Sequence, residues 1–232
     1  MVLPLYLAMT AREFTACSSL PDRIGWMACH FSPYSTGLSN LPASLPPGSL
    51  LILNDRTPPQ GHSPDLIARQ LEEIQSRTGC AGVLLDFQRP GCDCTAAVAR
   101  AVIRTLSCPV AVSDVYEAAG DCPVFLSPPP PHIPLNEHLS PWQGRQIWLE
   151  AACAAETVTV TAGGSTFLEV PYAPLEVPHQ DAQLHCRYRI ETAPDQIVFT
   201  LCRTRQDLQP LLEEAAGFGV TTAVGLYQQL GA

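Results

Sequence analysis

The sequence predicts an α/β fold, namely a small (β/α)8 or TIM-like barrel with a β-rich insertion before the last helix and strand. Two observations lead to this prediction. Short apolar runs alternate with helical stretches along most of the chain, which is the pattern of parallel strands joined by crossovers. The chain has 232 residues, a length at which one α/β barrel still forms a single domain. We therefore expect one barrel domain over residues 1–232, with an inserted subdomain at about 156–195.

The first half of the chain supplies five of the expected strands and two helices. Apolar runs that end in polar residues are typical of parallel strands buried on both faces. They lie at Leu3–Met9, Ile24–Phe31, Leu50–Asn54, Gly82–Phe87 and Pro109–Ser113. The first helix should begin at Ser63-Pro64-Asp65, which gives the expected cap and first turn, and should end at Gly79. The second helix is expected at about Thr95–Leu106.

The second half completes the barrel around the insertion. Two β-branched runs on either side of Gly163-Gly164 predict a hairpin that does not fit the α/β alternation. In order, the expected elements are strands at Val124–Ser127 and Gln146–Ala151, the hairpin arms Thr157–Thr161 and Thr166–Val170, an extension of this small sheet through Ile190 and Ile197–Cys202, a helix at about Gln206–Phe218 and a last strand at Thr222–Tyr227.

The charged residues and the apolar runs exclude several functions. All 13 basic residues are arginine, so no lysine is available for a Schiff base or a phosphate-binding loop. The net charge of -9 argues against a nucleic-acid-binding surface. No apolar run reaches the roughly twenty residues of a membrane helix, and the N-terminal segment lacks the positive charge of a signal peptide. We expect a soluble, cytoplasmic protein with neither nucleic-acid nor membrane partners.

The chain has ten cysteines, several of them inside expected strands or helices, where cysteine behaves as a small apolar residue. We expect free thiols, and thiol titration of the denatured, unreduced protein should find close to ten. The pair Cys92 and Cys94 has no second pair at zinc spacing, and no two histidines have metal-ligand spacing. We therefore expect no metal ion and no other cofactor.

The fourth strand resembles a signature of a known enzyme family. Its sequence, Ala-Gly-Val-Leu-Leu-Asp-Phe-Gln over residues 81–88, is similar to the Asp-Gly-x-Asp-x-Asp-x-Glu strand of glycoside hydrolase family 18, the chitinase-like barrels. Gly82 and Asp86 match this pattern. The order of the C-terminal elements is also similar, because a small β-rich insertion precedes the last helix and strand in that family. The resemblance implies a carbohydrate substrate.

Three departures from the family pattern affect the expected chemistry. Ala81 and Leu84 replace the first two aspartates of the pattern, and Gln88 replaces the catalytic glutamate. In the family, this glutamate protonates the leaving group, and the preceding aspartate orients the substrate N-acetyl group, which acts as the nucleophile. A neutral amide cannot supply a proton. The resemblance therefore implies a divergent member that lacks the standard hydrolytic mechanism.

Polar residues at the ends of several expected strands should converge, because the C-terminal ends of barrel strands share one face. The candidate catalytic residues are Asp86, Asp114 and Glu150. When carboxyl groups are crowded, their repulsion raises the pKa of one group above that of another, so one can carry a proton while the other is ionised, as acid catalysis requires. The candidate substrate-binding residues are Tyr34, Asp55, Gln88, Tyr116, Trp142 and Tyr227. The alternative is that the carboxylates cap helices or pair with arginines, and that the aromatic rings pack in a core.

Three functional hypotheses remain open from the sequence. The first is a carbohydrate-directed protein that binds an amino-sugar glycan without the standard mechanism of the family. The second is an active glycoside hydrolase that uses Asp86 with Asp114 or Glu150. The third is a scaffold barrel with no small-molecule ligand. Period-2 alternation directs Asp86, with Leu84 and Gln88, into the barrel, and it directs Val83, Leu85 and Phe87 toward the helices.

Overall fold

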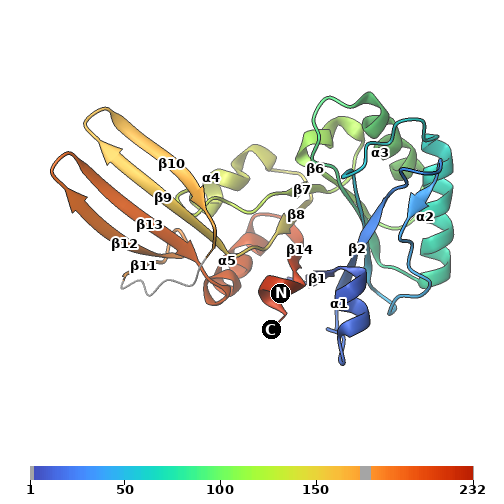
Figure 1. Cartoon of the computed structure of the whole chain (residues 1–232), viewed down its shortest axis with the longest axis horizontal. Coiled ribbons are helices and arrows are strands. Elements are labelled where there is room, and N and C mark those ends of the chain that lie inside the picture. The colour runs from blue at the N-terminus through green and yellow to red at the C-terminus, as the bar shows by residue number, and fades with distance from the viewer. Residues whose placement is uncertain (1–2, 173–178, 232) are drawn as a thin grey trace. The chain divides into compact units, whose positions relative to one another are not determined.

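A closed barrel of eight strands forms the core of the fold in the computed structural model, which describes residues 3–172 and 179–231 (Figure 1). The strands follow one another around the barrel in chain order, and β1 closes the barrel by pairing with both β2 and β14. The predicted fold class is confirmed. The barrel strands are β1 (Leu5–Met9), β2 (Ile24–Phe31), β4 (Leu50–Asn54), β5 (Gly82–Asp86), β6 (Val110–Ser113), β7 (Val124–Leu126), β8 (Ile147–Glu150) and β14 (Val220–Leu226). A short strand β3 (Leu38–Ser39) pairs antiparallel with β2.

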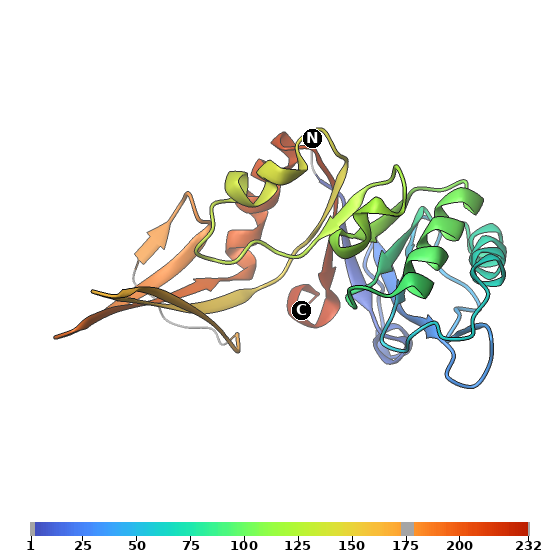
Figure 2. The same cartoon turned by 90° about the horizontal axis from the view of Figure 1, so that it is seen from above.

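Helices α2 (Pro64–Thr78) and α3 (Asp93–Thr105) pack outside the barrel beside β4, β5 and β6, as both views show (Figures 1 and 2). The cap predicted for α2 is confirmed, since Ser63 is the N-cap and Gly79 ends the helix with a left-handed φ of 66°. Shorter helices were not predicted because they offer too few turns for a periodic pattern. They are α1 (Ala11–Ala16), η1 (Asp114–Ala119), α4 (Leu135–Leu139), η2 (Ser140–Trp142) and α6 (Tyr227–Leu230).

The chain divides into two compact units. One consists mainly of Pro4–Leu126 with Arg145–Glu150 and Thr221–Ala232, and the other mainly of Ser127–Gly144 with Ala151–Val220. The second unit holds α5 (Arg205–Gly217) and a five-stranded antiparallel sheet with the order β10-β9-β13-β12-β11. Its strands are β9 (Ala154–Thr161), β10 (Gly164–Val170), β11 (His179–Asp181), β12 (Cys186–Ala193) and β13 (Gln196–Arg203). The predicted hairpin is confirmed as β9 and β10, whereas residues 173–178 of the expected insertion lie outside the described residues.

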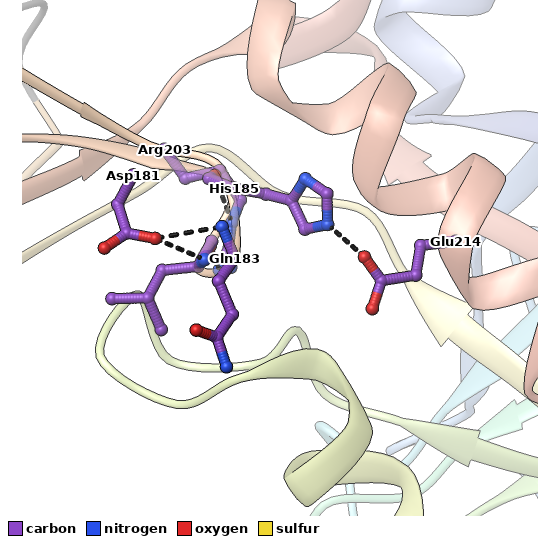
Figure 3. A network of polar contacts seen from close by, with 6 residues as sticks. Asp181, Gln183, His185, Arg203 and Glu214 are labelled. Atoms are coloured by element: carbon purple, nitrogen blue, oxygen red, sulfur yellow. Dashed lines mark hydrogen bonds and ion pairs between the residues drawn. The ribbon is translucent and has the colours of Figure 1, made fainter.

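A buried arginine joins separate segments of this second unit. The Arg203 side chain is 1% exposed, and it donates hydrogen bonds to the carbonyl oxygens of His185 at 3.2 Å, Leu184 at 3.0 Å and Pro129. Beside it, the Asp181 carboxylate accepts hydrogen bonds from two backbone N–H groups, and the His185 ring lies 2.6 Å from a carboxylate oxygen of Glu214 on α5 (Figure 3). These polar contacts hold the turn between β11 and β12 against the last turn of α5.

The alternation predicted along the fourth strand is confirmed. Leu84 belongs to the apolar cluster inside the barrel, whereas Val83, Leu85 and Phe87 belong to the cluster that includes the buried faces of α2 and α3. The interior cluster consists of Ala8, Leu50, Ile52, Leu84, Ala111, Phe125, Trp148 and Val224. These side chains pack against one another inside the barrel, as side chains do in the filled core of a (β/α)8 barrel.

The Gly82→Ala substitution should destabilise the barrel, because no room exists for a side chain at this position. A Cβ atom there would lie 3.0 Å from the Pro109 carbonyl oxygen and 3.1 Å from the ring of Trp148. We expect a loss of about 1–3 kcal/mol in the free energy of unfolding, which is typical of overpacking, measured by urea denaturation. Gly217→Ala is the matched control, since nothing lies within 4 Å of the added atom. Equal stabilities of the two variants would contradict the close approach.

Candidate functional site

A cavity of about 880 Å³ opens among the loops that follow β1, β2, β4 and β5, at the C-terminal ends of these strands. Its size lies within the range of small-ligand sites. Most of its lining residues have polar side chains, and these include Asn54, Asp55, Asp86 and Gln88. The loops at this end of a barrel are where substrates bind, and three of the residues predicted for the site share this one cavity.

Asp86 lies where this cavity meets the interior of the barrel. It also lines a second, smaller cavity of about 60 Å³, together with Glu150 and the interior residues Leu84 and Phe125. The predicted direction of the Asp86 side chain is therefore confirmed. Because strands β5 and β8 both end at this level, the carboxyl groups of Asp86 and Glu150 face a common, mostly apolar space.

Burial governs the protonation of these two carboxyl groups. Desolvation, with a smaller contribution from the charge of Asp86, raises the pKa of Glu150 to about 7. Desolvation also raises the pKa of Asp86, and the charge of Asp55 adds to this effect, whereas the hydrogen bond from Gln88 opposes it. Glu150 can therefore carry a proton near neutral pH, while the hydrogen bond from Gln88 favours the ionised form of Asp86.

Glu150→Gln should weaken the pH dependence of folding stability. The folded protein holds a proton on Glu150 up to a pH of about 7, whereas the unfolded chain releases it near the ordinary value of 4.5. The stabilisation is therefore fully present below pH 4.5 and is lost as the pH rises toward 7. We expect urea denaturation to show wild-type protein losing ~2–3 kcal/mol over this range. Glu150→Gln should lose much less.

The matched control for this experiment is Glu73→Gln, which changes an exposed glutamate on α2. This control should retain the wild-type slope of stability against pH. Equal slopes for wild type and Glu150→Gln would contradict a raised pKa at Glu150.

Gln88 and Asp55 organise the loop after β5. The Gln88 side-chain amide donates to Asp86 Oδ1 at 2.6 Å. The Asp55 side chain is 4% exposed and accepts hydrogen bonds from the backbone N–H groups of Gln88 and Arg89, both at 3.0 Å. Asp55 thus ties the loop after β4 to the loop after β5, and its carboxylate oxygens are already occupied by these donors.

The other predicted site residues lie away from the two cavities. The Asp114 carboxylate accepts a hydrogen bond from the backbone of Val115 at 2.9 Å. Tyr116 is buried against Phe87, and its hydroxyl donates to the Arg89 carbonyl oxygen. Tyr34 is 95% exposed, Tyr227 lies with its hydroxyl 3.4 Å from the thiol of Cys17, and Trp142 belongs to the unit that holds the five-stranded sheet.

Several residues that line the large cavity were not among the predicted site residues. They include three arginines, Arg12, Arg56 and Arg89. Their sequence positions could have indicated this for two of them, because Arg56 and Arg89 each lie within three residues of the end of a barrel strand. His30, which also lines the cavity, has its Nδ1 atom 3.0 Å from the carbonyl oxygen of Ala28.

Comparison with protein-family models and with curated sequences found no match. Solved structures share the architecture. The spore cortex-lytic enzyme SleL of Bacillus megaterium QM B1551 matches with a TM-score of 0.54 and 8% sequence identity, over 96% of this chain and 70% of that chain. The chitinase of Chromobacterium violaceum ATCC 12472 matches with a TM-score of 0.51 and 9% identity, over 98% and 95%. The fold is similar to that of chitinase-like barrels.

The Bacillus cereus SleL structure gives a comparable match, with a TM-score of 0.51 and 9% identity, over 96% of this chain and 70% of that chain. At this level of identity, the likeness concerns the fold. Within the described part of the chain, no group of three or more histidine, cysteine, aspartate or glutamate side chains could hold a metal ion. No helix among the described residues has the length and apolar character needed to cross a membrane.

Proposed function

We propose that this protein binds an amino-sugar glycan in the 880 Å³ cavity and does not hydrolyse it by the standard mechanism of the chitinase-like family. One observation carries the proposal. Gln88 stands at the position where the resemblance implies an acid. Its side-chain amide donates a hydrogen bond to the Asp86 carboxylate, which lines the same cavity, at 2.6 Å. Such a carboxylate can accept a hydrogen bond from a substrate N–H group, but the amide beside it cannot protonate a leaving group.

The fold and the polarity of the cavity support a carbohydrate ligand. The similar structures are described as a chitinase and as spore cortex-lytic enzymes. The cavity offers hydrogen-bonding side chains from four loops, including Thr10, Asn40, Asn54 and Gln88. A sugar presents many hydroxyl groups, so a lining rich in donors and acceptors suits it better than an apolar lining does.

Titration calorimetry with chito-oligosaccharides tests this proposal. Wild-type protein should bind a chitotetraose, and the mixture should release no new reducing ends. Asp86→Asn should weaken binding by about tenfold or more, because it replaces a charged hydrogen-bond acceptor with a neutral amide. Asp22→Asn, which alters an exposed aspartate in the loop before β2, is the matched control and should bind as wild type does. Absence of binding by wild-type protein would refute the proposal.

The second candidate function is glycoside hydrolysis with Glu150 as the acid. It is favoured by the pKa of Glu150, which burial raises to about 7, as general acid catalysis near neutral pH requires. Under this alternative, wild-type protein cleaves an aryl N-acetylglucosaminide, and Glu150→Gln abolishes the cleavage while Asp114→Asn leaves it intact. Cleavage that survives Glu150→Gln would exclude Glu150 as the acid.

A further inference from the structure

The large cavity collects positive charge in a chain that is strongly acidic. Its lining residues include Arg12, Arg56 and Arg89 and the two acidic residues Asp55 and Asp86. Three positive and two negative groups give this lining a formal charge of +1, whereas the whole chain carries -9. Arg12 lies in the first turn of α1, and Arg56 and Arg89 lie in the loops after β4 and β5, so their convergence is a property of the folded barrel.

Both carboxylates of the cavity accept hydrogen bonds from the loop after β5, and among the described residues neither is paired with an arginine side chain. Asp55 accepts hydrogen bonds from the backbone N–H groups of Gln88 and Arg89, and Asp86 accepts one from the side chain of Gln88. Across residues 3–172 and 179–231, no carboxylate lies within ion-pair distance of the three cavity arginines. Other arginines of the chain do have acidic partners, namely Arg104, Arg145, Arg187 and Arg189.

The backbone around two of these arginines is held in place. The Arg89 guanidinium donates to the Arg56 carbonyl oxygen at 2.7 Å, and the Arg56 N–H donates to the side chain of Asn54 at 3.2 Å. Asp55, between Asn54 and Arg56, ties the two loops together. These contacts hold together the two loops that carry Arg56 and Arg89, both of which line the cavity.

Arginine side chains of this kind bind anions. The guanidinium group keeps its charge at all physiological pH values, and its planar donors match the geometry of a carboxylate or a phosphate. A neutral glycan would leave three such charges on the cavity wall without an ionic partner. A glycan that carries an acidic substituent would give them one.

We propose that the cavity binds an anionic amino sugar, whose carboxylate or phosphate group is received by Arg12, Arg56 and Arg89 while the sugar ring lies toward Asp86. This inference rests on the proposed glycan-binding function and adds the substrate class. The shared chemistry is an acidic group on an N-acetylated sugar. This acidic group is either a carboxylate or a phosphate.

Three probes that share one ring separate these possibilities. N-acetylglucosamine is neutral, N-acetylmuramic acid adds a lactyl carboxylate to the same sugar, and N-acetylglucosamine 6-phosphate adds a phosphate. Titration calorimetry at low salt should give an affinity about tenfold higher for at least one anionic probe than for the neutral sugar. The preferred probe identifies the acidic group. The preference should shrink as salt is raised, because ions screen exposed charges.

The variants Arg12→Gln and Arg56→Gln test which groups provide the preference. Neither side chain has a hydrogen bond or ion pair among the described residues that its loss would break, so both variants should fold as wild type does. In each of them, the ratio between the affinities for the preferred anionic probe and for N-acetylglucosamine should fall toward one. Arg100→Gln removes the same charge from an exposed position on α3 and should keep the wild-type ratio.

Each outcome of this experiment supports or refutes a specific claim. Equal affinity for all three sugars, or a preference that survives both cavity variants, overturns the anionic site while leaving glycan binding intact. If no sugar binds, the proposed function fails, and titration with inorganic phosphate then examines the arginines alone. Phosphate binding that Arg56→Gln weakens supports an anion site without a glycan, whereas absence of phosphate binding overturns both proposals.

Discussion

Replacing Gln88 with glutamate should give the protein measurable glycosidase activity. The substitution exchanges an amide for a carboxyl group of nearly the same size, at a side chain that lines the large cavity and lies 2.6 Å from Asp86. Because two adjacent carboxyl groups cannot both ionise easily, the new acid would hold a proton near neutral pH. General acid catalysis contributes roughly two to four decades of rate. Release of a fluorescent aglycone from an aryl N-acetylglucosaminide measures the gain.

Gln88→Asn provides the matched control for this gain of activity. It alters the same position without adding an acid, so it should remain as inactive as wild type. The double variant Gln88→Glu with Asp86→Asn should lose the gain, since the carboxylate that orients the substrate is then missing. Binding of the probe by Gln88→Glu without any cleavage would show that the cavity cannot support hydrolysis with this acid restored.

Replacing Arg203 with methionine should cause the largest loss of stability in the unit that holds the five-stranded sheet. The methionine side chain is apolar, so the carbonyl oxygens of Pro129, Leu184 and His185 would lose their buried donor. Each buried polar group left without a partner costs about 1–3 kcal/mol. We expect a loss of ~3 kcal/mol or more in the free energy of unfolding, measured by urea denaturation.

Arg189→Met is the control for this loss. Arg189 forms an exposed ion pair with Glu191 at 2.9 Å, a type of contact that contributes roughly 0–1 kcal/mol. The control should therefore unfold at nearly the wild-type urea concentration. An Arg203→Met protein as stable as this control would mean that solvent satisfies the three carbonyl groups, and Arg203 would then have no structural role.

The sequence was most informative where a residue's environment follows from its own neighbours. The strands β2 and β4 begin and end where the apolar runs predicted, because a strand buried on both faces needs an unbroken run of apolar residues. The inward direction of Asp86 followed from period-2 alternation along β5. The helix cap at Ser63 and the turn at Gly79 were also readable, because each depends on the local backbone.

Residues whose role depends on distant partners could not be predicted in this way. Arg12, Arg56 and Arg89 share one cavity, but each comes from a different segment of the chain, and a position just after a strand does not show which way an exposed side chain turns. Asp114 follows a strand as Asp86 does, yet its carboxylate turns to its own backbone. Strand position thus indicates which end of the barrel a residue occupies, whereas the direction of a loop side chain depends on the tertiary fold.

The three tryptophans are distributed so that fluorescence can follow the two compact units separately. Trp148 lies inside the barrel and Trp26 in the layer outside it, both nearly inaccessible to water, whereas Trp142 belongs to the unit with the five-stranded sheet. A Trp142→Phe protein would report only on the environment of the barrel. A protein that keeps Trp142 and carries Trp26→Phe and Trp148→Phe would report only on the other unit. Emission spectra of these two proteins in increasing urea reveal directly whether the units melt in one cooperative transition or in two.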